Sequence, residues 1–313
     1  MSDDLHGTKR YEVRHVTEYT YDDYVTASYG RACLRPRATD HQVVTSNLIE
    51  VSPRADVMSE HTDFFGNFSH YLEIRNRHTV LRVKKTSQVE VSWPRVDVDA
   101  LNKWTIGQAR AEMARVAAGR DVDHLTYLLP SQLVAPTPAV QAYAREHLPD
   151  DRPLGEALVN LYELIYSEFK YAKGATNNST TLDELLANKA GVCQDFAHLA
   201  VGMCRVVGLP ARYVSGYIET QPPPGKQKLE GSDATHAWMS VRTPLGWNDL
   251  DPTNNHFADS RYIVTAWGRD FRDVSPMKGV IFTESKSSKL KVGVDVLPLS
   301  DKGVPLQEPL PAE

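Results

Sequence analysis

The chain has 313 residues, of which 41% are hydrophobic and 24% are charged, and its net charge is −5. This length suits two domains with substantial cores. The acidic balance argues against a dedicated nucleic-acid-binding protein, because such proteins present clustered positive charge to phosphates. No apolar run approaches the roughly 18 residues that a membrane-spanning helix needs. Neither nucleic acid nor a membrane is therefore an expected partner.

Cysteine usage and the N-terminus bear on location. The three cysteines include no Cys-x-x-Cys pair, which predicts free thiols in a reducing compartment and no zinc site. Residues 1–6 are acidic and lack an apolar signal region, so a cytoplasmic location is predicted. Short basic clusters, such as residues 82–85, are expected to be solvated strand faces.

Residues 8–100 predict an N-terminal β domain. Residues 11–19 alternate apolar and polar side chains, and residues 80–85 and 88–93 are further strand candidates. Residues that favour turns separate these segments. Several short strands in succession predict a β-sandwich-like arrangement.

Helical character begins after the β domain. A helical connector is predicted over residues 101–152, with helices at 106–117 and 137–147. The predicted core, which includes two C-terminal strands, occupies residues 153–298. The proline-containing residues 299–313 are expected to form a flexible tail.

The predicted core contains residues that mark where its helices begin and end. Residues 181–184 carry a capping-box pattern, and an apolar helix over about 197–207 ends at a glycine and a proline. A strand is predicted over residues 211–219, and a hairpin over residues 236–250. The proline-rich segment between them, residues 221–232, is either a lid or a plain surface loop.

The segment from Gly191 to His198 carries the strongest chemical signal, because Cys193 lies where a loop enters an apolar helix. A helix N-terminus favours a thiolate, since its free N–H groups and partial positive charge stabilise an anion. The same N–H groups can hold the oxyanion of a tetrahedral intermediate. Downstream, His236 is placed to act as a base and Asp251 to orient its imidazole. This order predicts acyl transfer from an amide or ester.

Other residues compete for the first two roles. A cysteine near the start of a helix is often a small buried hydrophobe, and Cys204 and Cys33 fit that description better than Cys193. His198 is a rival base, but five residues beyond the thiol it lies about 500° around the helix and faces away or sideways. Asp195 could cap the helix rather than take part in chemistry.

The carboxylate is also open to two interpretations. Asp249 competes with Asp251, because strand alternation puts both on one face. A hairpin turn centred on Leu245 would place His236 opposite Asn254, about three residues beyond Asp251. A bulge could close that gap.

At these residues the chain resembles the transglutaminase-like superfamily, in the bacterial form with an added N-terminal β domain. The resemblance covers nearly the whole chain. It rests on residues 34–37, 63–67, 181–198, 208–217, 236–238, 246–247, 251–254, 268–270 and 273–276.

The resemblance implies an α+β fold with a papain-like core, in which helices pack on an antiparallel sheet. It maps Cys193 to the nucleophile, His236 to the base and Asp251, rather than Asp249, to the orienting carboxylate. Members often carry histidine where this chain has Tyr262, so substrate specificity is expected to differ. The secondary site candidates are Asp195, Tyr217, Trp238 and Tyr262.

The resemblance does not fix the reaction. The prediction is a cysteine acyltransferase or amide hydrolase that forms a thioester on a peptide, isopeptide or glutamine-like carbonyl of a peptide or protein substrate, with hydrolysis favoured over crosslinking. The alternative is a non-catalytic binding or scaffold protein. No cofactor and no metal are expected, because the sequence lacks a His-x-x-x-His motif, a cysteine pair and an Asp-rich calcium loop. The oligomeric state is left open.

Overall fold

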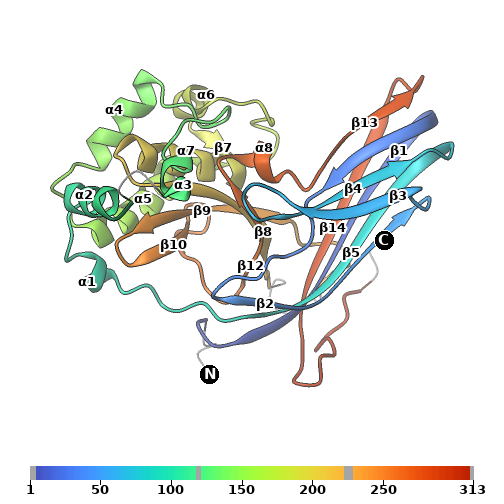
Figure 1. The fold of residues 1–313 in the computed structure, drawn as a ribbon, viewed down its shortest axis with the longest axis horizontal. Coiled ribbons are helices and arrows are strands. Elements are labelled where there is room, and N and C mark those ends of the chain that lie inside the picture. The colour runs from blue at the N-terminus through green and yellow to red at the C-terminus, as the bar shows by residue number, and fades with distance from the viewer. Residues whose placement is uncertain (1–4, 118–120, 222–227, 311–313) are drawn as a thin grey trace.

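The computed structural model describes residues 5–117, 121–221 and 228–310 (Figure 1). A long curved sheet extends from a core in which helices cover a second sheet (Figure 1). The expected α+β class is confirmed. Within the described residues, no helix combines the length and the apolar character needed to cross a membrane.

The curved sheet is antiparallel and is organised around its longest strand, β1. β5 and β14 pair with the first half of β1, whereas β4 and β13 pair with its second half. β2 then pairs with β5, and β3 pairs with β4. Side chains of these strands form a separate apolar cluster, so this region has its own small core. The strands are β1 (Lys9–Ala32), β2 (Gln42–Ser52), β3 (Val57–Thr62), β4 (Phe68–Ile74), β5 (His78–Val91), β13 (Met277–Thr283) and β14 (Ser288–Pro298).

The two C-terminal strands join the N-terminal sheet, although the sequence analysis grouped them with the core. Gly279 of β13 lies opposite Gly30, and Val296 of β14 lies opposite Val13. The alternation of side chains along a strand indicates that it has a buried face, but not which sheet it joins. Both ends of the chain therefore build the same sheet.

Lys85 contradicts the expectation that residues 82–85 are solvated. It lies on the inward face of β5 with Val83 and is 0% exposed. Its Nζ is 4.3 Å from the centroid of the Tyr217 ring, and it has no hydrogen-bond partner in the described part of the chain. Because alternate residues of a strand share a face, Lys85 follows Val83 inward despite its charge.

The helices confirm several sequence signals. α2 and α4 match the predicted segments, and the capping box of Thr181 with Glu184 is formed at the start of α6. α5, which begins after Pro153, packs with α2, α4 and α7 in the largest apolar cluster. The helices are α1 (Val98–Leu101), α2 (Ile106–Ala117), α3 (Val122–Thr126), α4 (Pro138–His147), α5 (Leu154–Glu168), α6 (Leu182–Asn188), α7 (Cys193–Val206) and α8 (Phe271–Val274).

The core sheet has the strand order β11-β10-β9-β8-β12, and α7 packs against β8 and β9 (Figure 1). The predicted hairpin is confirmed as β9 and β10. A short parallel pair, β6 and β7, precedes α7. The strands are β6 (Lys170–Tyr171), β7 (Ala190–Gly191), β8 (Ala211–Ile218), β9 (Thr235–Thr243), β10 (Gly246–Asp251), β11 (His256–Phe257) and β12 (Tyr262–Gly268).

Two side-chain amides from the N-terminal region close the outer edge of the core sheet. Gln42 both donates to the carbonyl of Val264 and accepts from its N–H, each at 2.8 Å. Asn67 does the same at Trp267, at 2.8 and 3.0 Å. Each amide thus replaces one residue of a neighbouring strand, so the edge strand β12 keeps its hydrogen bonds and the two regions are tied together.

Stacked cations and aromatic rings reinforce this interface. Arg37 lies 3.3 Å from the ring centroid of Trp267, and Arg212 lies 3.6 Å from the same ring. Arg212 also stacks on Trp247 at 4.1 Å. Such contacts are favourable where the guanidinium is desolvated.

The predicted lid and tail are described in part. Residues 222–227 and 311–313 lie outside the described residues. After residue 227, the N–H of Glu230 donates to the carbonyl of Leu310, and the N–H of Leu310 donates to the carbonyl of Lys228. Backbone hydrogen bonds therefore join the end of the described chain to the residues that precede β9.

Candidate active site

Cys193 is the first residue of α7, as the sequence indicates. The Asp195 carboxylate accepts hydrogen bonds from the N–H of Val192 at 2.8 Å and from the Thr176 hydroxyl at 2.6 Å. A Cβ at Gly191 would lie 2.9 Å from that carboxylate, so only glycine fits there. Asp195 therefore fixes the turn that delivers the thiol to the helix N-terminus.

His236, near the start of β9, lies between Cys193 and Asp251. Its Nε2 is 2.6 Å from Oδ2 of Asp251, and Cys193 lies close enough to the imidazole to help raise its pKa. Because Nε2 is committed to the carboxylate, Nδ1 is the ring nitrogen left for the thiol. The fold thus brings the three residues predicted from the sequence into one line of contacts.

Asp251 is buried and fully hydrogen-bonded. Tyr262 Oη and Asn254 Nδ2 each donate to its Oδ2 at 2.6 Å. The N–H groups of Thr253 and Asn254 donate to Oδ1 at 2.8 and 3.4 Å. Five donors, counting His236, therefore hold one carboxylate in a fixed orientation.

The electrostatics of this pair favour charge on both members. Burial disfavours the imidazolium of His236, but the attraction of Asp251, its hydrogen bond and the nearby Cys193 outweigh it and raise the pKa of His236 to about 10. Burial also opposes the carboxylate, yet the attraction of His236 and the donated hydrogen bonds lower the pKa of Asp251 to about 2. A protonated imidazole beside the thiol is the environment that stabilises a thiolate.

Aromatic residues surround the thiol. Cys193 is partly exposed and packs against the cluster that contains Tyr213 and Ala237. Tyr171 is 48% exposed. Tyr171 of β6 pairs with Gly191 of β7, two residues before Cys193. Burial raises the pKa of Tyr171, and the nearby Cys193 adds to the shift. Tyr171 therefore offers an exposed aromatic surface beside Cys193.

Trp238 explains why Asp249 is not the partner of His236. The hairpin register places Asp249 opposite Ser240, and Trp238 Nε1 donates to Asp249 at 2.7 Å. Each donor on β9 thus reaches diagonally to a carboxylate on β10. Asp249 is taken by the indole, and Asp251 is left for the imidazole.

The predicted hairpin register is wrong by one residue. Gly246 pairs with Thr243, so the turn consists of Pro244 and Leu245. This register, extended to His236, reaches residue 253 rather than residue 254. No bulge is needed, because the contact with Asp251 is diagonal.

Tyr217 lies away from the thiol. Its hydroxyl is 2.9 Å from Nδ1 of His15 on β1, and the second nitrogen of His15 is 3.0 Å from the hydroxyl of Thr17. With Lys85 above its ring, Tyr217 forms part of the buried contact between the two regions.

His198 is buried on α7 and makes a structural contact. Its Nε2 accepts a hydrogen bond from the N–H of Phe271 at 3.1 Å, and its ring lies 4.8 Å from that of Tyr213. Burial lowers the pKa of His198 to about 4, although the nearby Asp270 acts in the opposite direction. A neutral acceptor is what the backbone N–H requires.

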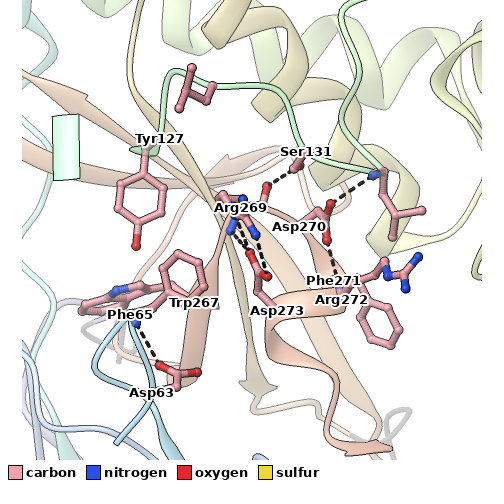
Figure 2. A network of polar contacts seen from close by, with 12 residues as sticks. Asp63, Phe65, Tyr127, Ser131, Trp267, Arg269, Asp270, Phe271, Arg272 and Asp273 are labelled. Atoms are coloured by element: carbon pink, nitrogen blue, oxygen red, sulfur yellow. Dashed lines mark hydrogen bonds and ion pairs between the residues drawn. The ribbon is translucent and has the colours of Figure 1, made fainter. Parts of the chain in front are cut away.

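The turn that follows β12, residues 269–273, is held by its own acidic residues (Figure 2). Asp270 accepts hydrogen bonds from the N–H groups of Arg272 and Leu133, both at 2.9 Å. Asp273 forms an ion pair with Arg269 at 3.0 Å (Figure 2). These contacts fix the position of the Phe271 N–H that His198 accepts.

The other two cysteines are buried. Burial raises the pKa of Cys33 to about 11 and that of Cys204 to about 12. Both are therefore expected to stay protonated near neutral pH, in agreement with their interpretation as core residues.

Three residues of this site were not singled out from the sequence. Asn254 lies in a segment that carries the family resemblance, so its pattern could have indicated a role. Thr176 and Tyr171 lie in a polar stretch without a distinguishing pattern, and only the fold brings them to α7. Among the described residues, no group of three or more His, Cys, Asp or Glu side chains is arranged to hold a metal ion.

Comparisons with known proteins identify the family of this chain. Residues 11–90 match the family described as the bacterial transglutaminase-like N-terminal region. Residues 141–252, which contain Cys193, His236 and Asp251, match the transglutaminase-like superfamily.

Relatives of full length are also found. The uncharacterised protein Rv2569c of Mycobacterium tuberculosis is 42% identical over 303 residues, which cover 94% of each chain. An uncharacterised protein of Mycobacterium leprae is 31% identical over 93% of this chain and 99% of its own length. The crystal structure of a candidate cysteine protease from Cytophaga hutchinsonii is similar, with a TM-score of 0.75 and 20% identity over 96% of this chain and 94% of that one. This last likeness shows the shared fold.

Proposed function

This chain belongs to the transglutaminase-like superfamily, and we propose that it is a cysteine enzyme that opens an amide bond through a thioester on Cys193. The single observation that carries the proposal is the buried His236–Asp251 pair, with 2.6 Å between Nε2 and Oδ2, in which Cys193 at the start of α7 helps raise the pKa of the imidazole. A fully hydrogen-bonded Asp251 would be a costly arrangement to maintain for packing alone.

In the proposed first step, the Cys193 thiolate attacks the carbonyl carbon of the substrate. The N–H groups of Cys193 and Gln194, the first two residues of α7, precede the first acceptor of the helix, so they can receive the developing oxyanion. The imidazolium of His236 then gives its proton to the leaving amine. The C–N bond breaks, the amine departs, and an acyl thioester remains.

In the second step, a new nucleophile attacks the thioester. Neutral His236 takes a proton from water or from an amine, the C–S bond breaks, and the Cys193 thiolate is restored beside the imidazolium. The product is an acid or a new amide. Asp251 keeps the imidazole oriented and stabilises its charged form in both steps. We favour water, since Cys193 is already partly open to solvent.

The substrate class follows from the surface next to the thiol. Tyr171 gives an exposed aromatic face, which suits the aliphatic part or backbone of a peptide. We therefore propose a peptide, isopeptide or glutamine-like side-chain amide as the substrate.

The test is the alkylation rate of Cys193 by iodoacetamide as a function of pH, read by peptide mass spectrometry. We expect wild-type Cys193 to react well below pH ~7, and His236→Ala to react only as pH approaches ~8.5. Cys33 and Cys204 are internal controls, since the same digest reports them and both are buried. If wild-type Cys193 reacts like an ordinary thiol, the scaffold alternative is preferred.

The two outcomes of the thioester are separated by a second assay. Ammonia release from a glutamine peptide would be followed with and without an added primary amine. Hydrolysis predicts release without incorporation of the amine. Preferential incorporation would instead identify amine transfer.

A further inference from the structure

Strand β13 is an exposed sheet edge with apolar side chains. Val280, Ile281 and Phe282 are 63%, 39% and 56% exposed. In the described chain, β13 pairs only with β1, so alternate N–H and C=O groups along its other side have no strand beside them. Natural proteins usually protect such an edge with proline, bulges or charge.

The contrast with β12 makes this edge unusual. The β12 edge is closed by the amides of Gln42 and Asn67. β13 contains neither proline nor an inward-pointing charge, and its segment Gly279–Thr283 carries no charged residue. The register shift beside β13 adds a residue to β1, between Val25 and Ala27, and not to β13. An apolar edge strand that itself contains no proline, inward-pointing charge or bulge is a template for another strand.

We infer that β13 is the contact strand of a homodimer, in which two copies of this chain pair β13 with β13 in antiparallel orientation. A twofold axis perpendicular to the sheet exchanges equivalent residues, and opposite residues of antiparallel strands share a face. The register must therefore join even-numbered residues to even-numbered ones. A register centred on Ile281 satisfies this condition.

Charge and side-chain shape select that register. It places Lys278 of each copy opposite Glu284 of the other, and both residues are exposed. Lys278 uses one donor on the carbonyl of Arg272 at 3.2 Å, and an ammonium group has two more. The same register sets Val280 against Phe282, an aliphatic–aromatic pair of the kind that stabilises sheets.

The neighbouring surface extends the apolar contact on both faces. On one face the ring of Tyr29 lies 5.9 Å from that of Phe282. On the other, a cavity of about 190 Å³ is lined by Ile281, Tyr21 and Leu72 among others. A second copy would therefore meet apolar side chains above and below the paired strands.

Analytical ultracentrifugation of the full chain over about a hundredfold range of concentration tests the proposal. We expect a dimer that dissociates on dilution. Val280→Lys should raise the dissociation constant by at least about tenfold, whereas the matched control Val43→Lys should leave it unchanged. Val43 is 58% exposed on β2, at the opposite edge of the same sheet.

A charge exchange identifies the register. Lys278→Glu alone and Glu284→Lys alone should each weaken the dimer about tenfold, because both place like charges opposite each other at two symmetric positions. The double variant restores opposite charges and should return the dissociation constant to within about threefold of the wild-type value. Far-UV circular dichroism would verify that each variant folds.

A chain that is monomeric at every concentration overturns the proposal. So does a dimer whose dissociation constant responds to Val43→Lys rather than to Val280→Lys. A dimer whose dissociation constant is unchanged by Lys278→Glu and by Glu284→Lys would also contradict it. None of these outcomes depends on the chemistry of Cys193.

Discussion

His236 and His198 are both buried in the core, yet their neighbours drive the two imidazoles to opposite charge states. His236 faces the carboxylate of Asp251, and its pKa rises to about 10. His198 accepts a backbone N–H, and burial lowers its pKa to about 4. Burial alone favours a neutral ring, and a carboxylate that is hydrogen-bonded to the ring reverses that preference.

Because their pKa values shift in opposite directions, the two histidines affect the free energy of unfolding in different pH ranges. His236 has a folded pKa above its unfolded value of about 6.5, so it stabilises the fold below that value and loses this contribution as pH rises toward 10. His198 has a folded pKa below its unfolded value, so its contribution is present above about pH 6.5 and is lost as pH falls toward 4.

The largest expected effect comes from removing the carboxylate of the first site. Asp251→Asn should lower the alkylation rate of Cys193 at about pH 6.5 by up to about 100-fold, because an ordinary thiol with a pKa of about 8.5 is only about 1% ionised there. His198→Gln is the matched control, since glutamine can still accept the Phe271 N–H. Equal losses in both variants would contradict the distinction drawn between the two histidines.

The acid limb of stability should depend on His198. The wild-type protein is expected to lose about 2 kcal/mol between about pH 7 and pH 5 through this residue, since the unfolded chain binds the proton that the fold excludes. The charged groups that face the ring are Asp270 and Arg205. Urea unfolding at several pH values would show a flatter acid limb in His198→Gln. An unchanged limb would mean that other groups control it.

Lys85 is a third buried titratable group, and desolvation of its amine is not offset by a carboxylate. Desolvation lowers its pKa well below the ordinary value, and the pKa of the adjacent His15 falls to about 3 for the same reason, with Lys85 adding to the shift. Lys85→Met keeps the length of the side chain and removes the amine, so we expect it to stabilise the fold by roughly 1–2 kcal/mol at neutral pH. A loss of stability in the same urea assay would show that the amine has a favourable role.

The sequence could predict the site more fully than the fold around it. The start of α7 and the β9–β10 hairpin follow from local signals, namely Gly191 before an apolar helix and alternation on either side of a turn. Those signals identified Cys193 and His236, although the hairpin register that they predicted set His236 opposite Asn254. The family resemblance chose Asp251 over Asp249, and the side-chain contact of Trp238, which no spacing rule contains, supplies the physical reason.

Most of the features that the sequence could not predict depend on pairing between segments that are distant along the chain. The strands β13 and β14 show the same alternation whether they join the core or β1, so the sequence could not choose between the two sheets. The inward position of Lys85 follows from strand periodicity, but its charge led to the opposite expectation. The contact of Tyr262 with Asp251 joins β12 to the end of β10, and it depends on the loop that brings the two together.

The smallest expected effect comes from removing one hydrogen-bond donor to Asp251 while the carboxylate itself is kept. Tyr262→Phe removes one of the five donors to Asp251 and leaves His236 in place, so we expect a loss of about 1 kcal/mol, or about fivefold in the alkylation rate near pH 6.5. Tyr262→His, which restores the residue that family members often carry, should recover most of this loss if its imidazole donates to Asp251. A Tyr262→Phe rate equal to that of wild type would mean that Asn254 and the backbone suffice to orient the carboxylate. A loss as large as that of Asp251→Asn would instead make Tyr262 essential for its position.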